Sequence, residues 1–323
     1  MIAAAAFEPA IESRFASDVR SGLSRSGQKE LPSTYLYDAL GSALFDAITF
    51  LPEYGLTRAD SRLLAEHSET IVTAMRGPFF VAELGSGSGA KTRWILEAAA
   101  RRGPVKYFPF DISPVALQNC GFILGRIPRV QITELQGEYM DGLAKAVGYR
   151  KPGEKLLLLF LGSTIGNFYL DAASNFLKRI RDQLAPGDGL LLGADLVKPL
   201  QQMLAAYDDP TGVTAAFNLN MLARINRELG ANFNLARFAH EARFNADASC
   251  IEMHLRATSR HRIYIRALDL HIEMKEGETI WTESSQKFRV EEIDSLASQT
   301  GFRLHSRWID ADWAFAESLM IAS

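Results

Sequence analysis

The residues whose types and spacing could do chemistry begin with a glycine-rich turn, Glu-Leu-Gly-Ser-Gly-Ser-Gly at positions 83–89. It follows directly on the apolar run 78–82, and Asp111 ends the next apolar run along the chain. Glycines let the backbone approach a ligand closely, and a carboxylate can accept hydrogen bonds from both hydroxyl groups of a ribose. An apolar strand that ends in an acidic residue and opens into such a turn is typical of a nucleotide-type cofactor site. Glycine clusters also form plain turns, so the surrounding elements must decide.

The elements that would position this turn alternate between apolar runs and helix-length segments. Further apolar runs stand at 105–110, 130–135, 156–161 and 190–194. Their largely continuous apolarity is expected of strands that are buried on both faces of a parallel sheet. Segments of helical length separate them, for example 115–127 and 171–184. This pattern predicts an α/β fold with a doubly wound parallel sheet.

The glycine spacing and the C-terminus distinguish two classes of cofactor. A dinucleotide dehydrogenase would share the glycine turn and Asp111. Here the glycines stand at 85, 87 and 89, without the two residues that precede the last glycine of the dinucleotide pattern. Segments 302–308 and 314–321 read as two strands around a polar turn. A late hairpin that closes a parallel sheet resembles the class I S-adenosylmethionine-dependent methyltransferases, and this resemblance favours S-adenosylmethionine over NAD.

Composition excludes several kinds of partner. The chain has 323 residues, of which 47% are hydrophobic and 23% charged, as in an ordinary globular protein with room for a large core. A net charge of −3 gives no electrostatic footprint for nucleic acid or for a membrane surface. Cys120 and Cys250 are expected to be buried thiols of a reducing compartment, so we expect a cytoplasmic protein.

The sequence shows no pattern typical of a targeting segment, a membrane helix or a metal site. Residues 1–14 contain a short apolar stretch without a basic leading segment, so we expect no signal peptide. No apolar run reaches the roughly 20 residues that a membrane helix needs. The six histidines show no metal-ligand spacing, and we expect no metal site.

Two regions fall outside the predicted sheet. Upstream, Thr57-Arg58-Ala59-Asp60 is a loose capping box for a helix that runs toward Met75. Downstream, residues 198–287 have their own periodicity, with a candidate helix at 217–229 and candidate strands at 251–256 and 262–265. Such an insertion is long enough for a second subdomain, and a small-molecule site between two domains is the default expectation.

A set of motifs runs along the chain in this order: Tyr37-Asp38-x-x-Gly41-Ser42-x-Leu44-Phe45, Pro52-Glu53-Tyr54, Thr57-Arg58-Ala59, Glu83-Leu84-Gly85-Ser86-Gly87, Phe160-Leu161-Gly162-Ser163-Thr164-Ile165-Gly166-Asn167-Phe168, Tyr207-Asp208-Asp209 and Glu283-x-Ser285-x-Lys287-Phe288. With these motifs the chain resembles one family, the ergothioneine-pathway histidine Nα-methyltransferases. The resemblance covers the chain from about residue 30 to its end. It implies transfer of methyl groups from S-adenosylmethionine to the α-amino group of L-histidine, giving trimethylhistidine (hercynine).

The resemblance also implies a division into domains. Residues 61–197 and 288–323 would form a Rossmann-like, class I methyltransferase domain. Residues 198–287 would form an inserted α+β substrate-recognition domain, and residues 1–60 an N-terminal segment that contributes to the substrate pocket.

Five residues match the cofactor side of the family. Gly85 would face S-adenosylmethionine, and Lys91 would lie near its methionine moiety. Asp111 would bind the ribose hydroxyls, although the same carboxylate could serve as a plain helix cap. Glu138 with Tyr139 would meet the adenine; the family commonly has Asp-Phe at these positions, and a loop acid is often simply solvated.

The residues that match the substrate side of the family are Tyr54, Asn167, Tyr207, Met253, Glu283 and Ser285. Asn167 and Tyr207 would hold the carboxylate of the amino acid as neutral donors. Glu283 and Ser285 alternate along an extended segment, so their side chains share one face and would grip the imidazole.

Tyr54 would complete the ring pocket and Met253 would pack against it. Both could also be ordinary core residues, and Glu283 a solvated strand residue.

Several questions stay open on the sequence alone. The proton acceptor is unknown, with Tyr37 as a weak candidate, and Gly55 stands where the family often has a second tyrosine, which could enlarge the pocket. A relative that methylates another amino acid or an indole-type amine is the main alternative. A non-catalytic cofactor-binding regulator is a lesser one. We expect a monomer whose partner is a small molecule.

Overall fold

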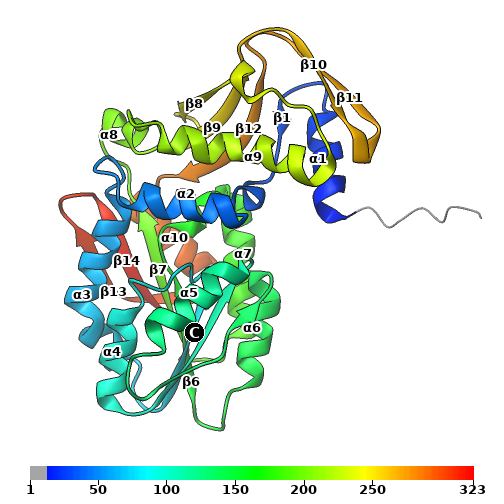
Figure 1. Ribbon diagram of the computed structural model, residues 1–323. Coiled ribbons are helices and arrows are strands. Elements are labelled where there is room, and N and C mark those ends of the chain that lie inside the picture. Colours follow the sequence, from blue (N-terminus) through cyan, green and yellow to red (C-terminus); the bar gives the residue numbers. More distant parts are fainter. Residues whose placement is uncertain (1–12) are drawn as a thin grey trace, which may run out of the picture.

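A computed structural model describes residues 13–323, and its largest element is one eight-stranded sheet (Figure 1). The strand order is β13-β14-β7-β6-β2-β3-β4, and β5 pairs with β3 beside this path. The strands are β2 (Phe79–Leu84), β3 (Val105–Asp111), β4 (Val130–Ile132), β5 (Leu135–Gln136), β6 (Lys155–Phe160), β7 (Gly189–Asp195), β13 (Phe302–Asp310) and β14 (Phe315–Ala322). Strands β2 to β7 pair in parallel, and β13 and β14 form the closing antiparallel hairpin. The predicted doubly wound class I methyltransferase sheet is confirmed.

Helices cover both faces of this sheet because its strands are apolar on both sides. One face packs against α6, α7 and α10 through a core that includes Phe80 and Leu158. The other face packs against α3, α4 and α5 through a core that includes Val81 and Leu157. The covering helices are α3 (Leu56–Ala74), α4 (Arg93–Arg102), α5 (Pro114–Leu124), α6 (Tyr139–Gly148), α7 (Leu170–Gln183) and α10 (Val290–Gln299).

A smaller α+β part, formed mainly by the segment between β7 and α10, lies above the main sheet in Figure 1. It contains a four-stranded sheet of order β1-β12-β9-β8 and the antiparallel pair β10-β11. The strands are β1 (Lys29–Glu30), β8 (Phe238–Asn245), β9 (Cys250–Ala257), β10 (His261–Ile265), β11 (Leu270–Met274) and β12 (Thr279–Gln286). The accompanying helices are α8 (Leu200–Ala205) and α9 (Val213–Leu229).

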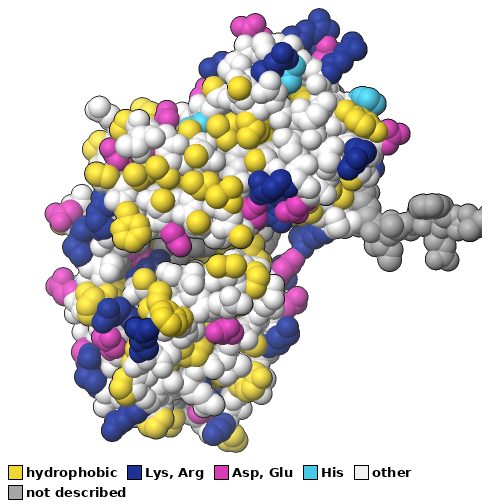
Figure 2. Space-filling view, in the orientation of Figure 1, with side chains coloured by type: hydrophobic (Ala, Val, Ile, Leu, Met, Phe, Trp, Pro, Cys, Tyr) yellow, Lys and Arg dark blue, Asp and Glu magenta, His cyan; other side chains and the backbone are white. Residues whose placement is uncertain are grey.

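The N-terminal elements share the core of this smaller part. Strand β1 pairs in parallel with β12, so that Lys29 lies opposite Ile280. Helices α1 (Arg14–Leu23) and α2 (Ala39–Thr49) contribute Val19 and Ile48 to the same apolar cluster as Phe217 and Leu255. Figure 2 shows a shadowed recess between the upper and the lower part of the molecule.

The reversal of strand order locates the ligand-binding edge of the main sheet. From β2 the chain runs outward through β3 to β4 and then returns to the other side of β2 at β6. In open α/β sheets ligands bind beyond the carboxyl ends of the strands at this switch point. Gly85 follows β2 and Gly162 follows β6, so both stand at the switch point.

Three local expectations need correction. Helix α3 begins at Leu56, ahead of the expected cap at Thr57, and its N-cap residue is Gly55, which has no side chain; the carboxylate of Asp60 turns into the interior. The strand expected at 130–135 is divided into β4 and β5. Strands β8 and β11 were not predicted, since most of their side chains are at least partly accessible and polar residues interrupt their apolar positions.

Within residues 13–323 no helix is long and apolar enough to cross a membrane. The same part of the chain holds no group of three or more His, Cys, Asp or Glu side chains that could bind a metal ion. The prediction about a signal peptide concerns residues 1–14, of which 1–12 lie outside the described residues.

Candidate active site

The glycine-rich turn joins β2 to α4 with a backbone that other residues would strain. Gly85, Gly87 and Gly89 have φ angles of 70°, 52° and 68°, in the left-handed region that glycine adopts without penalty. A Cβ atom on Gly89 would lie 2.6 Å from Cδ1 of Leu124, so α5 packs directly on the turn. The turn therefore requires glycine for conformation at all three positions and for close packing at Gly89.

Glu83, the last acidic residue of β2, anchors this turn to the following helix. Its buried carboxylate accepts hydrogen bonds from Oγ1 of Thr92, at 2.9 and 2.8 Å, and from the hydroxyl of Tyr107. Burial raises the pKa of Glu83 to about 7, against the opposing effect of these hydrogen bonds. Glu83 thus serves the architecture of the turn and does not reach its open side.

Asp111 stands at the carboxyl end of β3 and faces the same turn. Its Oδ2 accepts a hydrogen bond from the backbone N–H of Gly87 at 3.0 Å, and its Oδ1 accepts one from Ser113 at 2.9 Å. Burial raises the pKa of Asp111, and the backbone donors oppose that rise. The carboxylate is thereby fixed beside the glycines.

Tyr139 faces the turn from the start of α6. A Cβ atom on Gly85 would lie 3.2 Å from the Tyr139 hydroxyl oxygen, so no side chain fits between them. Burial, together with the negative charge of Asp111, raises the pKa of Tyr139. Gly85, Asp111 and Tyr139 are therefore brought together as the sequence predicted.

Lys91 and Glu138 have different surroundings. Lys91 forms an ion pair with the fully buried Asp60, whose Oδ2 also accepts the backbone N–H of Gly162 at 3.0 Å. The Lys91 ammonium thus lies between the ends of β2 and β6. Glu138 is exposed, and its side chain pairs with Arg14 of α1 at the rim of this region.

A cavity between the two parts of the molecule gathers the residues predicted for the substrate. Its lining includes Tyr37, Tyr54, Asn167, Tyr207, Met253, Glu283 and Ser285. They come from separate elements: loops on either side of α2, the short helix Thr164–Asn167, the loop after α8, and strands β9 and β12. Gly162 also lines the cavity, which connects it to the neighbourhood of Lys91.

Aromatic side chains form one wall of this cavity. The rings of Tyr54 and Tyr207 meet edge-on with centroids 6.2 Å apart, and Tyr37 meets Phe217 edge-on at 5.5 Å. Burial raises the pKa of Tyr37, Tyr54 and Tyr207 well above that of a free phenol. The wall consequently offers hydroxyl groups and not phenolates, and Tyr37 is such a hydroxyl.

Glu283 and Ser285 share the cavity face of β12, as their alternation predicted. A register shift between Trp281 and Glu283 interrupts the pairing of β12 with β9 just before this pair. Glu283 is half-buried at the cavity wall, and burial raises its pKa to about 7 while the charge of Lys287 acts in the opposite direction. The hydroxyl of Tyr207 donates to Oγ of Ser285 at 2.6 Å.

Lys287 is the residue of this site whose importance the sequence analysis missed. Its side chain is fully buried behind the cavity, and its Nζ donates to Oη of Tyr207 at 2.9 Å and to Oγ of Ser285 at 2.8 Å. The period of two that joins Glu283 to Ser285 extends to Lys287, and this signal could have placed all three on one side of the segment.

Gly55 does not enlarge the cavity. A Cβ atom at this position would lie 2.1 Å from Cε3 of Trp313, so the indole of Trp313 fills the space that a larger side chain would need. The question of a wider pocket, left open by the sequence, is answered by a residue of the C-terminal hairpin that closes the gap.

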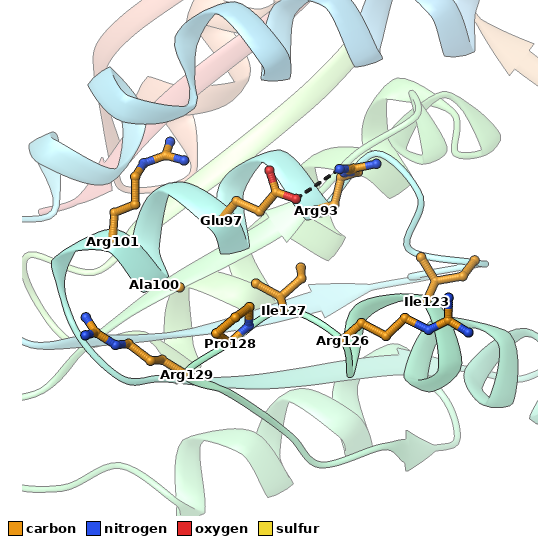
Figure 3. A pocket seen from close by; sticks show the side chains of 9 residues that line it. All are labelled: Arg93, Glu97, Ala100, Arg101, Ile123, Arg126, Ile127, Pro128 and Arg129. Atoms are coloured by element: carbon orange, nitrogen blue, oxygen red, sulfur yellow. Dashed lines mark hydrogen bonds and ion pairs between the residues drawn. The ribbon is translucent and has the colours of Figure 1, made fainter.

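A second cavity of about 680 Å³ lies between α4 and the segment that follows α5. Four of its lining residues are arginines, and in Figure 3 Arg93 turns toward Glu97 while Arg101, Arg126 and Arg129 do not converge. None of the predicted site residues lines it. We therefore assign the chemistry to the smaller cavity.

Comparison with known proteins agrees with this geometry. The model of a family described as histidine-specific, S-adenosylmethionine-dependent methyltransferases matches residues 15–322. The chain belongs to this family. S-adenosylmethionine is accordingly its cofactor.

Relatives within and around the family are similar over most of the chain. The histidine N-alpha-methyltransferase of Mycolicibacterium smegmatis is 42% identical over 308 residues, which cover 94% of each protein. That of Mycobacterium tuberculosis is 41% identical over 304 residues, covering 94% of this chain and 93% of the relative. Ergothioneine biosynthesis protein 1 of Neurospora crassa is 29% identical over 291 residues, covering 88% of this chain and 32% of the relative.

The residues around the glycine turn fit the family's cofactor. Asp111 is held by two backbone donors and still offers carboxylate oxygens, which are acceptors for a ribose diol. Gly85, without a side chain, lets the hydroxyl of Tyr139 approach the turn closely. The Asp111 carboxylate and the Tyr139 ring are thus suited to the ribose and the base of a nucleoside.

Proposed function

We propose that this protein transfers three methyl groups from S-adenosylmethionine to the α-amino group of L-histidine. The product is Nα,Nα,Nα-trimethylhistidine (hercynine), and the reaction is a step of ergothioneine biosynthesis. The observation that carries the proposal is that Glu283 and Ser285 share one small cavity with Asn167 and Tyr207. Family membership and the names of the relatives at 41–42% identity support the same substrate.

The proposed cofactor contacts follow from the glycine turn. Asp111 binds the ribose hydroxyls, Gly85 lies against the cofactor, and Lys91 lies near its methionine moiety. Tyr139 and Glu138 contact the adenine, Tyr139 from inside the site and Glu138 from its exposed edge, where its carboxylate also pairs with Arg14. Proximity of Lys91 to Gly162, which lines the substrate cavity, supports a shared boundary between cofactor and substrate.

The proposed substrate contacts hold both ends of histidine. The Asn167 amide and the Tyr207 hydroxyl donate to its carboxylate. The Glu283 carboxylate accepts an imidazole N–H, and the Ser285 hydroxyl meets the other ring nitrogen. Tyr54 and Met253, both buried, complete the apolar walls of the ring pocket.

The chemistry asks the protein mainly for placement. Bound S-adenosylmethionine supplies the methyl group on an already activated sulfonium. The cavity residues orient a neutral amine toward it, and orientation of this kind can account for several orders of magnitude in rate. Burial lowers the pKa of the substrate ammonium, so that water can take the proton. The hydroxyl groups of Tyr37, Tyr54 and Tyr207 stay protonated and act as donors.

Repeated transfer is compatible with the same set of contacts. With the carboxylate and the ring both anchored, only the amine is free to rotate and present its lone pair again after each methylation. The aromatic wall next to Tyr37 leaves the growing methylammonium group in contact with ring faces, which attract cations.

The domain organisation proposed for this function joins residues 61–197 and 288–323 in the methyltransferase domain. Residues 198–287 form the substrate-recognition domain, and the segment 1–60 supplies Tyr37 and Tyr54 to the pocket. We expect a cytoplasmic monomer. The two cysteines, Cys120 and Cys250, are free and buried, as suits a reducing compartment.

The test is an end-point assay with the purified protein, S-adenosylmethionine and L-histidine, read by mass spectrometry. We expect trimethylhistidine and S-adenosylhomocysteine in a ratio of about one to three, since each transfer consumes one cofactor. Accumulation of monomethylated histidine alone would contradict the proposed multiplicity. A bound cofactor without any methyl transfer would favour a regulatory protein instead.

A further inference from the structure

Behind the substrate cavity lies a buried charge cluster to which no role has been given. Lys287 and Lys198 both approach the carboxylate of Asp195 at the carboxyl end of β7; the distance from Lys287 Nζ to Oδ2 of Asp195 is 3.0 Å. Asp195 is 3% exposed and Lys287 is 0% exposed. The cluster thus holds two cations and one anion, and a buried charge of this kind persists only where partners compensate it.

The contacts of Lys287 determine which atoms donate. An ammonium group has three N–H donors and no acceptor. Lys287 donates to Oη of Tyr207 at 2.9 Å and to Oγ of Ser285 at 2.8 Å, and its Nζ forms an ion pair with Oδ2 of Asp195 at 3.0 Å. Because the ammonium cannot accept a hydrogen bond, neither hydroxyl can donate to Lys287.

The two hydroxyl protons must then find other acceptors. The Tyr207 hydroxyl donates to Oγ of Ser285 at 2.6 Å. Ser285 thereby accepts from both Tyr207 and Lys287, which occupies its acceptor sites, and its own proton is left for a partner in the cavity. When a substrate carboxylate meets Tyr207, the Tyr207 proton turns from Ser285 to the carboxylate, since Lys287 cannot accept it.

The net charge of the cluster favours binding of the substrate carboxylate, as the hydrogen bonds of Lys287 do. With Lys287 and Lys198 against Asp195, the cluster has one positive charge in excess, next to the place proposed for the substrate carboxylate. The ammonium also lies 4.5 Å from the ring centroid of Tyr207. Burial makes such a charge act more strongly than it would in water.

We propose that Lys287 is a positioning residue of the substrate pocket. Its ammonium occupies acceptor sites on Tyr207 and Ser285, so that these hydroxyls present protons to acceptor atoms of the amino acid. It also supplies the positive charge that a bound carboxylate needs without touching the substrate. This inference rests on the proposed function and specifies how the site selects a free amino acid with an unprotonated ring nitrogen.

The test measures the Kd of L-histidine by calorimetry with S-adenosylhomocysteine bound, in a double-mutant cycle. We expect K287M to weaken histidine binding by about tenfold or more, because charge-assisted hydrogen bonds are lost. In the background Y207F/S285A, where both hydroxyls are gone, only the charge of Lys287 is left to lose, so K287M should weaken binding by a clearly smaller factor, about threefold or less. A residue with only a structural role would instead weaken binding by the same factor in both backgrounds, which would overturn the proposal.

The matched control is K198M. Lys198 is also buried and shares Asp195, but its Nζ contacts the backbone oxygen of Leu196 at 2.8 Å and no hydroxyl of the cavity. K198M removes one positive charge of the cluster but no hydrogen bond to Tyr207 or Ser285, so we expect it to lower stability and to weaken histidine binding clearly less than K287M does, by about threefold or less. Equal losses of histidine affinity in K198M and K287M would overturn the proposal.

Failure of the proposed function and failure of the inference about Lys287 give different results. If K287M does not fold, K287Q, which keeps one donor group, replaces it in the same cycle. If wild type binds S-adenosylhomocysteine but not L-histidine, the proposed function fails. If wild type binds histidine and the Lys287 variants bind it equally well, only the inference about Lys287 fails.

Discussion

Gly55 lies face to face with the indole of Trp313, so closely that a Cβ atom on the glycine would stand 2.1 Å from Cε3 of the ring. The φ angle of Gly55 is −74°, which any residue can adopt, and the glycine is therefore required for space alone. The contact joins the loop before α3 to the turn of the C-terminal hairpin, 258 residues further along the chain.

The first prediction follows from this contact. Gly55→Ala should lower the free energy of unfolding by about 1–3 kcal/mol, the usual cost of overpacking. Urea denaturation measures the change. In Gly55→Ala/Trp313→Leu the smaller side chain should restore part of the loss. Gly27→Ala is the control, since a Cβ there meets nothing within 4 Å. Equal stabilities of the two alanine variants would refute the contact.

The second prediction concerns the ion pair between Lys91 and Asp60. Lys91→Met leaves Asp60 fully buried without its cation and should cost about 3–5 kcal/mol in the free energy of unfolding. Asp60→Asn/Lys91→Met removes both charges and should be more stable than Lys91→Met alone. Lys145→Met, at an exposed position of α6, is the control for losing a lysine charge that leaves no buried partner behind among residues 13–323. A double variant no better than the single one would contradict this account.

The third prediction concerns the pH dependence of histidine binding. The Glu283 carboxylate must be ionised to accept an imidazole N–H, and its pKa is raised to about 7. Raising the pH from about 6 to about 8 should therefore strengthen binding by up to about tenfold through this group. In Glu283→Gln this contribution should vanish, and the Kd at about pH 8 should rise by tenfold or more. A pH profile identical in both proteins would rule out Glu283 as the titrating group.

Stability should change with pH in the opposite sense. Burial raises the pKa of Glu283 above its ordinary 4.5, so the folded state binds the proton more tightly than the unfolded state. The contribution of Glu283 to stability is full below about pH 4.5 and is lost as the pH rises toward about 7. Glu283→Gln should therefore gain stability relative to wild type above about pH 7. Denaturation curves at acidic and at mildly basic pH provide the comparison.

The fourth prediction concerns the cofactor side. Asp111→Asn replaces a charged acceptor and should weaken S-adenosylhomocysteine binding by about tenfold or more, measured by calorimetry. Asp141→Asn, an exposed carboxylate in the first turn of α6, should bind the cofactor as wild type does. Unchanged binding in Asp111→Asn would move the ribose contact to another residue.

The main sheet could be predicted from local patterns, and the residues of the substrate cavity from the resemblance to the family. Runs such as 156–161 are apolar at every position, which marks a strand buried on both faces, and β6 occupies that place. Glu283 and Ser285 alternate, and both line the cavity. The apolar run and the alternation depend on neighbours within a few residues, so the sequence contains both directly.

Other features depend on partners far along the chain and could not be predicted. Asp60 matched a capping box, but Lys91 and the backbone of Gly162 draw its carboxylate into the interior. Trp313 fills the space beside Gly55. The role of Lys287 emerges only when Asp195 and Tyr207 are seen around it.

The most direct test of the central claim is a competition experiment with limiting S-adenosylmethionine and equal concentrations of L-histidine and L-tryptophan. Mass spectrometry of the products shows which amine receives the methyl groups. The account predicts methylated histidine and unchanged tryptophan, because Glu283 and Ser285 present hydrogen-bonding groups that suit an imidazole. Methylated tryptophan with unchanged histidine would contradict the roles proposed for both residues while leaving the fold and the cofactor in place.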